Sequence, residues 1–158
     1  MFGRRPLVTV KVLCATSAVT LEPTTLVNPI TRAAQANPLA VQLQTVAKFI
    51  AANQALGLKR QVFFVSLGGF DTHDNLNTQQ SPLLARLGHA MAYFDGVLGN
   101  INGVDMRSAV TTFTASDFNR TFTTNGDGTD HAWGAHHLIL GGAVKGGDLY
   151  GTFPIYGA

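Results

Sequence analysis

Apolar residues recur at three- and four-residue spacing in two stretches of the chain, and each stretch predicts an amphipathic helix. The first stretch follows Asn37-Pro38, which reads as an N-cap with proline at the first helical position, and it stops at Gly57. The second follows Ser81-Pro82 and ends at Gly99. Its apolar stripe consists of Leu83, Leu84, Leu87, Met91, Phe94, Val97 and Leu98.

Three short runs rich in Val, Phe, Ile and Thr predict strands, and the first two alternate with these helices. They are QVFFVSL (Gln61 to Leu67), AVTTFT (Ala109 to Thr114) and HLILGG (His137 to Gly142). The first run is nearly all apolar, which is typical of a strand covered on both faces by helices. The alternation of helix and strand predicts an α/β fold with a mostly parallel sheet flanked by helices, spanning residues 37–158.

Residues 1–36 lack a clean periodicity and are interpreted as an irregular lead-in. The start, MFGRRPLVTVKVLCATSA, has a basic pair and a short apolar run, which is typical of an export signal. Lys11 interrupts the apolar run, so we favour an irregular or truncated start. No stretch reaches the length of about 18 apolar residues that a transmembrane helix needs, so none is expected.

Composition narrows the classes of protein that fit. A chain of 158 residues with 46% hydrophobic and 13% charged residues is a globular domain rather than a disordered segment. Its net charge of +2 and its scattered basic residues indicate no nucleic-acid partner. The single cysteine, Cys14, excludes an internal disulfide and a cysteine-based zinc site. Apart from Glu22, all carboxylates lie between Asp71 and Asp148, so we expect the chemistry in the second half.

Two polar clusters follow the first two predicted strands. Asp71 and His73 come after a pair of glycines, and a carboxylate and an imidazole at this spacing can reach one cation from a tight turn. A capping aspartate beside a solvated histidine is the alternative. Asp117 and Arg120 form the second cluster, as an ion pair or with Arg120 holding an anionic substrate. If the strands are parallel, both clusters emerge at the same edge of the sheet.

A third cluster lies in NGDGTDHAWGAHH (Asn125 to His137). It combines turn-forming glycine pairs with Asp130, His131, His136 and His137. Imidazole and carboxylate without thiolate suit zinc, iron, nickel or manganese. The third cluster therefore adds candidate metal ligands to those of the first two. The glycines of GGAVKGG fit neither a dinucleotide-binding fingerprint nor a P-loop, so a nucleotide site is the weaker interpretation.

Four motifs carry a family resemblance: GGFDTHDN, TTFTASDFNRT, NGDGTDHAWGAHH and GGAVKGGDLYGTFP. They occur in the order found in the bacterial domain-of-unknown-function 1501 family, which the chain resembles over roughly residues 38 to 156. That family resembles the alkaline phosphatase and sulfatase superfamily. The resemblance implies the C-terminal half of an alkaline-phosphatase-like fold in a periplasmic or exported protein, often with a twin-arginine signal. A cytoplasmic location is the alternative, because the signal in this chain is weak.

The resemblance also implies roles for individual residues. Asp71 matches the first acid of the superfamily's Asp-x-x-x-His motif, but His73 lies two positions further on rather than four. Asp117 resembles the acid of an Asp-His pair, with Phe118 in the place of the histidine. His131 resembles a later histidine, and a different alignment makes Asp130-His131 the Asp-His pair. The superfamily's N-terminal metal-binding acid and its nucleophile have no counterpart here.

We therefore expect a metal-binding module that resembles phosphate or sulfate ester metallohydrolases and is incomplete. Divalent zinc, manganese or iron would be held by residues drawn from Asp71, His73, Asp117, Asp130, His131, His136 and His137. In an active enzyme, Arg120 would steady the anionic ester. The alternative is a non-catalytic structural or interaction domain derived from that fold, which Phe118 and the missing N-terminal residues favour.

Overall fold

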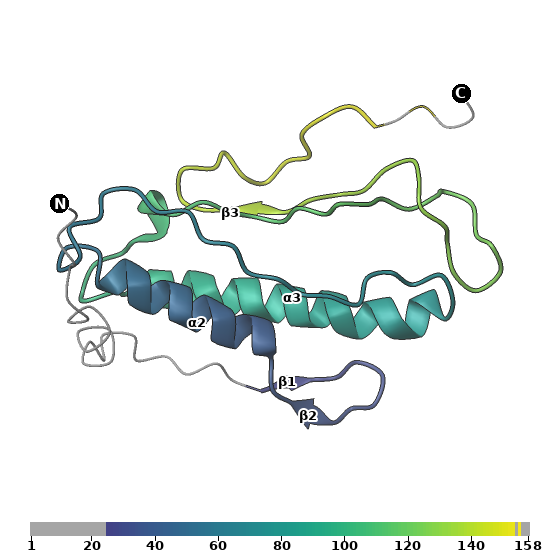
Figure 1. Ribbon diagram of the computed structural model, residues 1–158, viewed down its shortest axis with the longest axis horizontal. Coiled ribbons are helices and arrows are strands. Elements are labelled where there is room, and N and C mark those ends of the chain that lie inside the picture. The colour runs from purple at the N-terminus through teal and green to yellow at the C-terminus, as the bar shows by residue number, and fades with distance from the viewer. Residues whose placement is uncertain (1–24, 154, 156–158) are drawn as a thin grey trace, which may run out of the picture.

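The structure is a computed structural model that describes residues 25–153 and residue 155. Two long helices lie side by side, and extended segments run along them (Figure 1). In chain order the elements are β1 (Leu26–Val27), β2 (Ala34–Gln35), α2 (Pro38–Ala51), α3 (Leu76–Leu98), the 3-10 helix η1 (Arg107–Ala109), β3 (Thr112–Phe113) and β4 (Ile139–Leu140). The candidate export signal lies outside the described residues. Neither helix described here combines the length and apolar character that crossing a bilayer requires.

Helix α2 begins where the sequence predicts. The side chain of Asn37 accepts a hydrogen bond from the backbone N–H of Leu39 at 3.2 Å, and Pro38 occupies the first helical position. The Asn37 side chain is also a tertiary contact. Its Nδ2 donates to the carbonyl of Arg86 at 2.8 Å and lies 3.0 Å from Nδ1 of His89, both on α3. A residue that caps one helix therefore also ties it to the next.

Replacing Asn37 with alanine is expected to destabilise the fold by about 1–3 kcal/mol. The change removes the cap of α2 and the side-chain hydrogen bond to the Arg86 carbonyl, and Asn37 is 1% exposed. Urea unfolding followed by circular dichroism measures the effect. Asn77→Ala, at an exposed position of α3, is the matched control and should stay within about 0.5 kcal/mol of the parent. Equal stability of the two variants would contradict the prediction.

Helix α3 begins earlier than predicted. The sequence indicates a start at Ser81-Pro82, but the helix starts at Leu76 and Pro82 lies inside it. Its first turn is held by the loop around Asp127. The backbone N–H of Leu76 donates to the carbonyl of Asp127 at 2.9 Å, and that of Asn75 donates to the Asp127 side chain at 3.1 Å. The added turn therefore depends on a partner about fifty residues away in sequence.

The core lies between α2 and α3. Asn37, just before α2, contacts the middle of α3, whereas Asn102, just after α3, donates to the carbonyl of Ala51 at the end of α2. These contacts show that the two helices point the same way, and the connection between them returns along their length (Figure 1). The buried cluster consists of Leu39, Ala40, Leu43, Val46, Ala47, Ile50, Ala90, Phe94, Val97, Leu98 and Ile101.

Residues 61–67 form an extended stretch of that connection. Gln42 of α2 holds the C-terminal end of this stretch, since Nε2 donates to the carbonyl of Ser66 at 3.0 Å and Oε1 accepts from the N–H of Ser66 at 3.1 Å. Val65 and Leu67 pack against the helical core. The stretch leads directly into the segment that carries Asp71 and His73, so its attachment to α2 positions one half of the candidate site.

The prediction of a mostly parallel sheet is wrong. The described residues contain two antiparallel two-stranded sheets, β1 with β2 and β3 with β4, with Thr112 opposite Leu140 in the second. Residues 61–67 join neither sheet, and Val62 and Phe64 are 99% and 91% exposed. The second predicted strand contains β3, which pairs with β4 in antiparallel orientation and not with residues 61–67. The helices also cover only one side of residues 61–67.

Candidate metal centre

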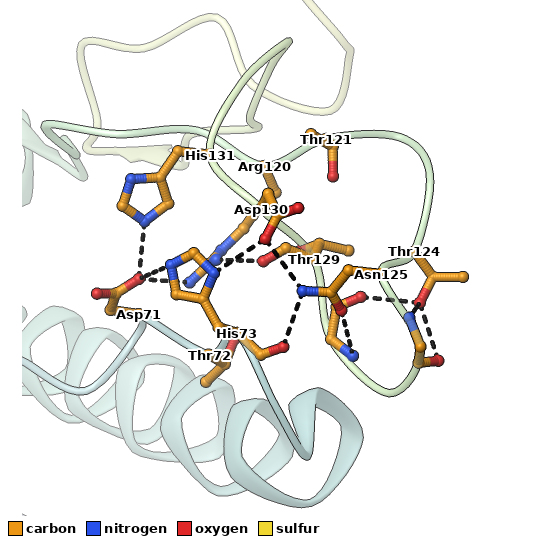
Figure 2. Close-up of polar contacts among 12 residues, drawn as sticks. Asp71, Thr72, His73, Arg120, Thr121, Thr124, Asn125, Thr129, Asp130 and His131 are labelled. Carbon is orange, nitrogen blue, oxygen red and sulfur yellow. Dashed lines mark hydrogen bonds and ion pairs between the residues drawn. The ribbon is translucent and has the colours of Figure 1, made fainter.

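Two segments far apart in sequence meet beyond the ends of the extended stretches. One carries Asp71 and His73, and the other is the long loop between β3 and β4, which carries Asp130 and His131 (Figure 2). Isolated antiparallel bridges join Arg120 to both His131 and Gly134 and close this loop on itself. The predicted meeting of the polar clusters is therefore present, although hydrogen-bonded parallel strands do not produce it.

Asp71, His73 and His131 form the centre of the site. The Oδ1 atom of Asp71 lies 2.7 Å from Nε2 of His131 and 3.1 Å from Nε2 of His73. One ligand atom from each residue lies within 4.8 Å of the other two. The side chain of Asp71 is 58% exposed and both imidazoles are 44% exposed, so solvent and small ions reach the site. Figure 2 shows the imidazoles of His73 and His131 directed toward the carboxylate of Asp71.

His73 makes a second contact, on the other side of its ring. Its Nδ1 lies 3.1 Å from Oδ1 of Asp130. That carboxylate oxygen also accepts from Nδ2 of Asn125 at 3.0 Å, and the same amide group donates to the backbone carbonyl of His73 at 3.2 Å. Asp130 therefore lies behind His73 rather than among the converging ligand atoms.

Arg120 joins the two segments that carry these residues. Its Nη1 donates to the carbonyl of Thr129 at 2.7 Å, and its Nη2 donates to the carbonyl of Phe70 and lies 3.3 Å from Oδ1 of Asp71. The guanidinium carbon also lies 5.1 Å from the ring centroid of Phe118. The side chain is only 18% exposed. In this structure Arg120 acts as a clamp across the site, and its ion pair is with Asp71.

Phe118 supports the second imidazole of the centre. Its ring stacks on that of His131, with centroids 4.4 Å apart and an angle of 15° between the planes. The rings of His73 and His131 are 4.9 Å apart. Phe118 thus forms an apolar wall against one candidate ligand.

The two carboxylates near His73 have pKa values below the ordinary 3.8. For Asp71 the main cause is the hydrogen bond with His131, and the attraction of His73 adds to it. For Asp130 the causes are the hydrogen bonds from His73 and Asn125. A carboxyl group with a lower pKa in the folded state stabilises the fold above its unfolded pKa, and this stabilisation is lost as the pH falls through the folded value. Both groups are therefore anionic at neutral pH.

Three other predicted ligands are not members of the converging cluster. Asp117 is exposed in the turn before Phe118. Nδ1 of His137 lies 3.3 Å from the hydroxyl of Thr114, and the ring of His136 packs against Phe153 with centroids 5.5 Å apart. Among the described residues, the structure brings together Asp71, His73 and His131, with Asp130 behind them.

The role of Asn125 is not predicted by the sequence pattern. Its Asn-Gly pair favours a turn, and the turn is present, since Oδ1 of Asn125 accepts from the N–H of Gly128 at 3.2 Å. Its amide also connects this turn to His73 and Asp130 across the site. A turn-forming pair of residues gives no information about distant contacts, so this contact could not be predicted from the sequence.

Comparisons with known proteins identify a family but no activity. The model of the family described as "Protein of unknown function (DUF1501)" matches residues 17–158. Neither a curated protein nor a solved structure gives a significant match. The matched range contains the whole candidate metal centre, while the description of the family names no substrate or cofactor.

Proposed function

We propose, from the premise that this chain belongs to the DUF1501 family, that it is a divalent-metal-binding module with its ion between Asp71, His73 and His131. The observation that carries the proposal is the convergence of one ligand atom from each of these residues, supplied by segments about sixty positions apart. Two residues of one turn, such as Asp71 and His73, lie close together because of local geometry alone. A ligand that arrives from a distant loop requires the fold to place it there.

The arrangement fits a small divalent ion. At the usual zinc–ligand distances of about 2.0–2.1 Å, ligand atoms in a tetrahedral shell lie about 3.3 Å apart. The Asp71 contacts of 2.7 and 3.1 Å are close to that spacing, so small side-chain movements suffice. Two imidazoles and one carboxylate suit zinc, and they also suit manganese and iron.

Three protein ligands leave a position open, and this supports a hydrolytic version of the proposal. Asp71, His73 and His131 would hold the ion, and a metal held by three ligands would lower the pKa of a water and polarise an ester oxygen. The exposure of both imidazoles leaves room for a substrate. The resemblance to phosphate and sulfate ester hydrolases supplies the substrate class. Among residues 25–153, no side chain is identified as the nucleophile.

A non-catalytic metal module is the second candidate. The observation that favours it is the position of Phe118, which covers one face of His131 where the enzymes that the motifs resemble have a histidine. Arg120 is also turned to protein oxygens rather than to open solvent. Turnover of chromogenic phosphate or sulfate esters, lost in His131→Ala, separates the hydrolase from this candidate.

Metal titration tests the proposal. We expect the parent protein to bind close to one zinc, manganese or iron ion per chain, measured by calorimetry and by plasma mass spectrometry after desalting. Asp71→Ala and His131→Ala should each weaken binding by more than about 100-fold, because each removes a direct ligand. His137→Ala is the matched control and should bind as the parent does. Absence of binding in the parent, or undiminished binding in both site variants with native circular dichroism, overturns the proposal.

A further inference from the structure

His73 lies between two carboxylates, one on each ring nitrogen. Its Nε2 faces Asp71 at 3.1 Å and its Nδ1 faces Asp130 at 3.1 Å. We infer that Asp130 is a positioning residue, which keeps a proton on Nδ1 of His73 so that Nε2 presents its lone pair to the ion. This inference rests on the proposed metal site and assigns Asp130 a role other than that of a ligand.

The two ring nitrogens of a neutral imidazole differ, because one carries the proton and the other the lone pair. A carboxylate can only accept a hydrogen bond, so the hydrogen bond between Nδ1 and Asp130 requires the proton to be on Nδ1. The contact of Nε2 with Asp71 is a charge contact without hydrogen-bond geometry, so it does not require a proton on Nε2. Histidines that bind metal commonly donate their second N–H to a carboxylate, which fixes both the tautomer and the plane of the ring. Asp130 has this relation to His73, and His73 is exposed enough to rotate without it.

Asn125 holds Asp130 in place. Its Nδ2 donates to the same Oδ1 atom that faces His73, at 3.0 Å, and to the backbone carbonyl of His73, at 3.2 Å. The backbone carbonyl of Asp130 accepts from the N–H of Thr121 at 2.9 Å. Side chain and backbone of Asp130 are thus both tied, and Figure 2 shows the contacts running from Asn125 through Asp130 to His73.

Two measurements on the same variants test this role. Long-range proton–nitrogen NMR spectra of uniformly ¹⁵N-labelled protein report which nitrogen of His73 carries the proton, and a competition titration reports the affinity for zinc. The spectra are recorded at about pH 8, above the ordinary pKa of an imidazole. The parent should show the proton on Nδ1, both without metal and with zinc bound at Nε2.

Asp130→Ala should lose the Nδ1–H tautomer and weaken zinc binding by about 10- to 100-fold. Asp130→Asn keeps an oxygen that accepts from Nδ1 and should lose less affinity. Asn125→Ala should fall between the parent and Asp130→Ala. Asp148→Ala changes the charge equally at an exposed position on the C-terminal segment and should leave both measurements unchanged.

Two results overturn the inference. An unchanged tautomer and affinity in Asp130→Ala show that Asp130 does not act through His73. A loss of binding as complete as in Asp71→Ala shows that Asp130 is itself a ligand. The proposed function can fail separately. If the parent binds no metal, the spectra of the metal-free protein still decide whether Asp130 sets the tautomer of His73.

Discussion

Gly128→Ala is expected to separate the two halves of the candidate metal centre. A Cβ atom on Gly128 would overlap the backbone carbonyl of His73 and lie 2.9 Å from the N–H nitrogen of Asp74. These are backbone atoms and cannot rotate aside as a side chain does, so the loop has to move away from His73. The move pulls Asn125 and Asp127 off their partners beside His73 and at the start of α3.

We expect this variant to be destabilised by about 1–3 kcal/mol, the usual cost of overpacking. It should also lose zinc affinity by at least about 10-fold, since Asp130 and His131 are carried on the displaced loop. Calorimetry and urea unfolding measure the two effects. Gly68→Ala is the matched control, because a Cβ there meets nothing within 4 Å. A Gly128→Ala protein with parental affinity and stability would show that the loop is not docked as described.

Phe94→Ala is expected to cause the largest loss of stability, about 3–5 kcal/mol. Phe94 is 2% exposed and lies in the core cluster between α2 and α3. Its removal takes a large apolar surface out of the core and leaves a cavity that helices tied at both ends cannot easily close. Since domains are commonly stable by only about 5–15 kcal/mol, this change brings the protein close to unfolding.

Thermal and urea unfolding, followed by far-ultraviolet circular dichroism, measure the change. Leu84→Ala is the matched control on the same helix, because Leu84 is 52% exposed and should change stability by less than about 1 kcal/mol. A cost below 1 kcal/mol for Phe94→Ala would contradict the central place given to this side chain.

Local signals explain what the sequence predicted well. The start of α2 depends on neighbours in sequence, Asn37 as cap and Pro38 behind it, and both are where the pattern places them. The start of α3 depends instead on the loop around Asp127. A boundary held by a distant segment leaves no mark in the residues beside it, so the prediction at Ser81-Pro82 was wrong.

The prediction of a parallel sheet was wrong for a related reason. An apolar run such as residues 61–67 shows that one side of an extended segment packs against a core, and Val65 and Leu67 do so. It does not show which backbone lies alongside it. The choice of β4 as the antiparallel neighbour of β3 depends on how the loop between them folds back.

The candidate site could be predicted in part. Asp71, His73 and His131 were recognised by residue type and spacing, and the structure brings them together. The separate position of Asp130 could not be predicted, because neighbouring Asp and His residues in sequence give no indication of which of them faces the centre of the candidate site. That distinction depends on the Asn125 turn, which orients Asp130 from the other side of the loop.

The side of residues 61–67 that the helices leave exposed has a practical consequence for work in solution. The side chains of Val62 and Phe64 are exposed to solvent, and the run from Gln61 to Phe70 contains no charged residue. An extended, uncharged segment that belongs to no sheet can pair with a strand of another molecule, much as an open sheet edge does, and proteins normally protect such edges with lysine, proline or a bulge. We therefore expect the protein to self-associate as its concentration rises. Light scattering across a dilution series should precede every metal titration, because clustering would alter the apparent number of binding sites.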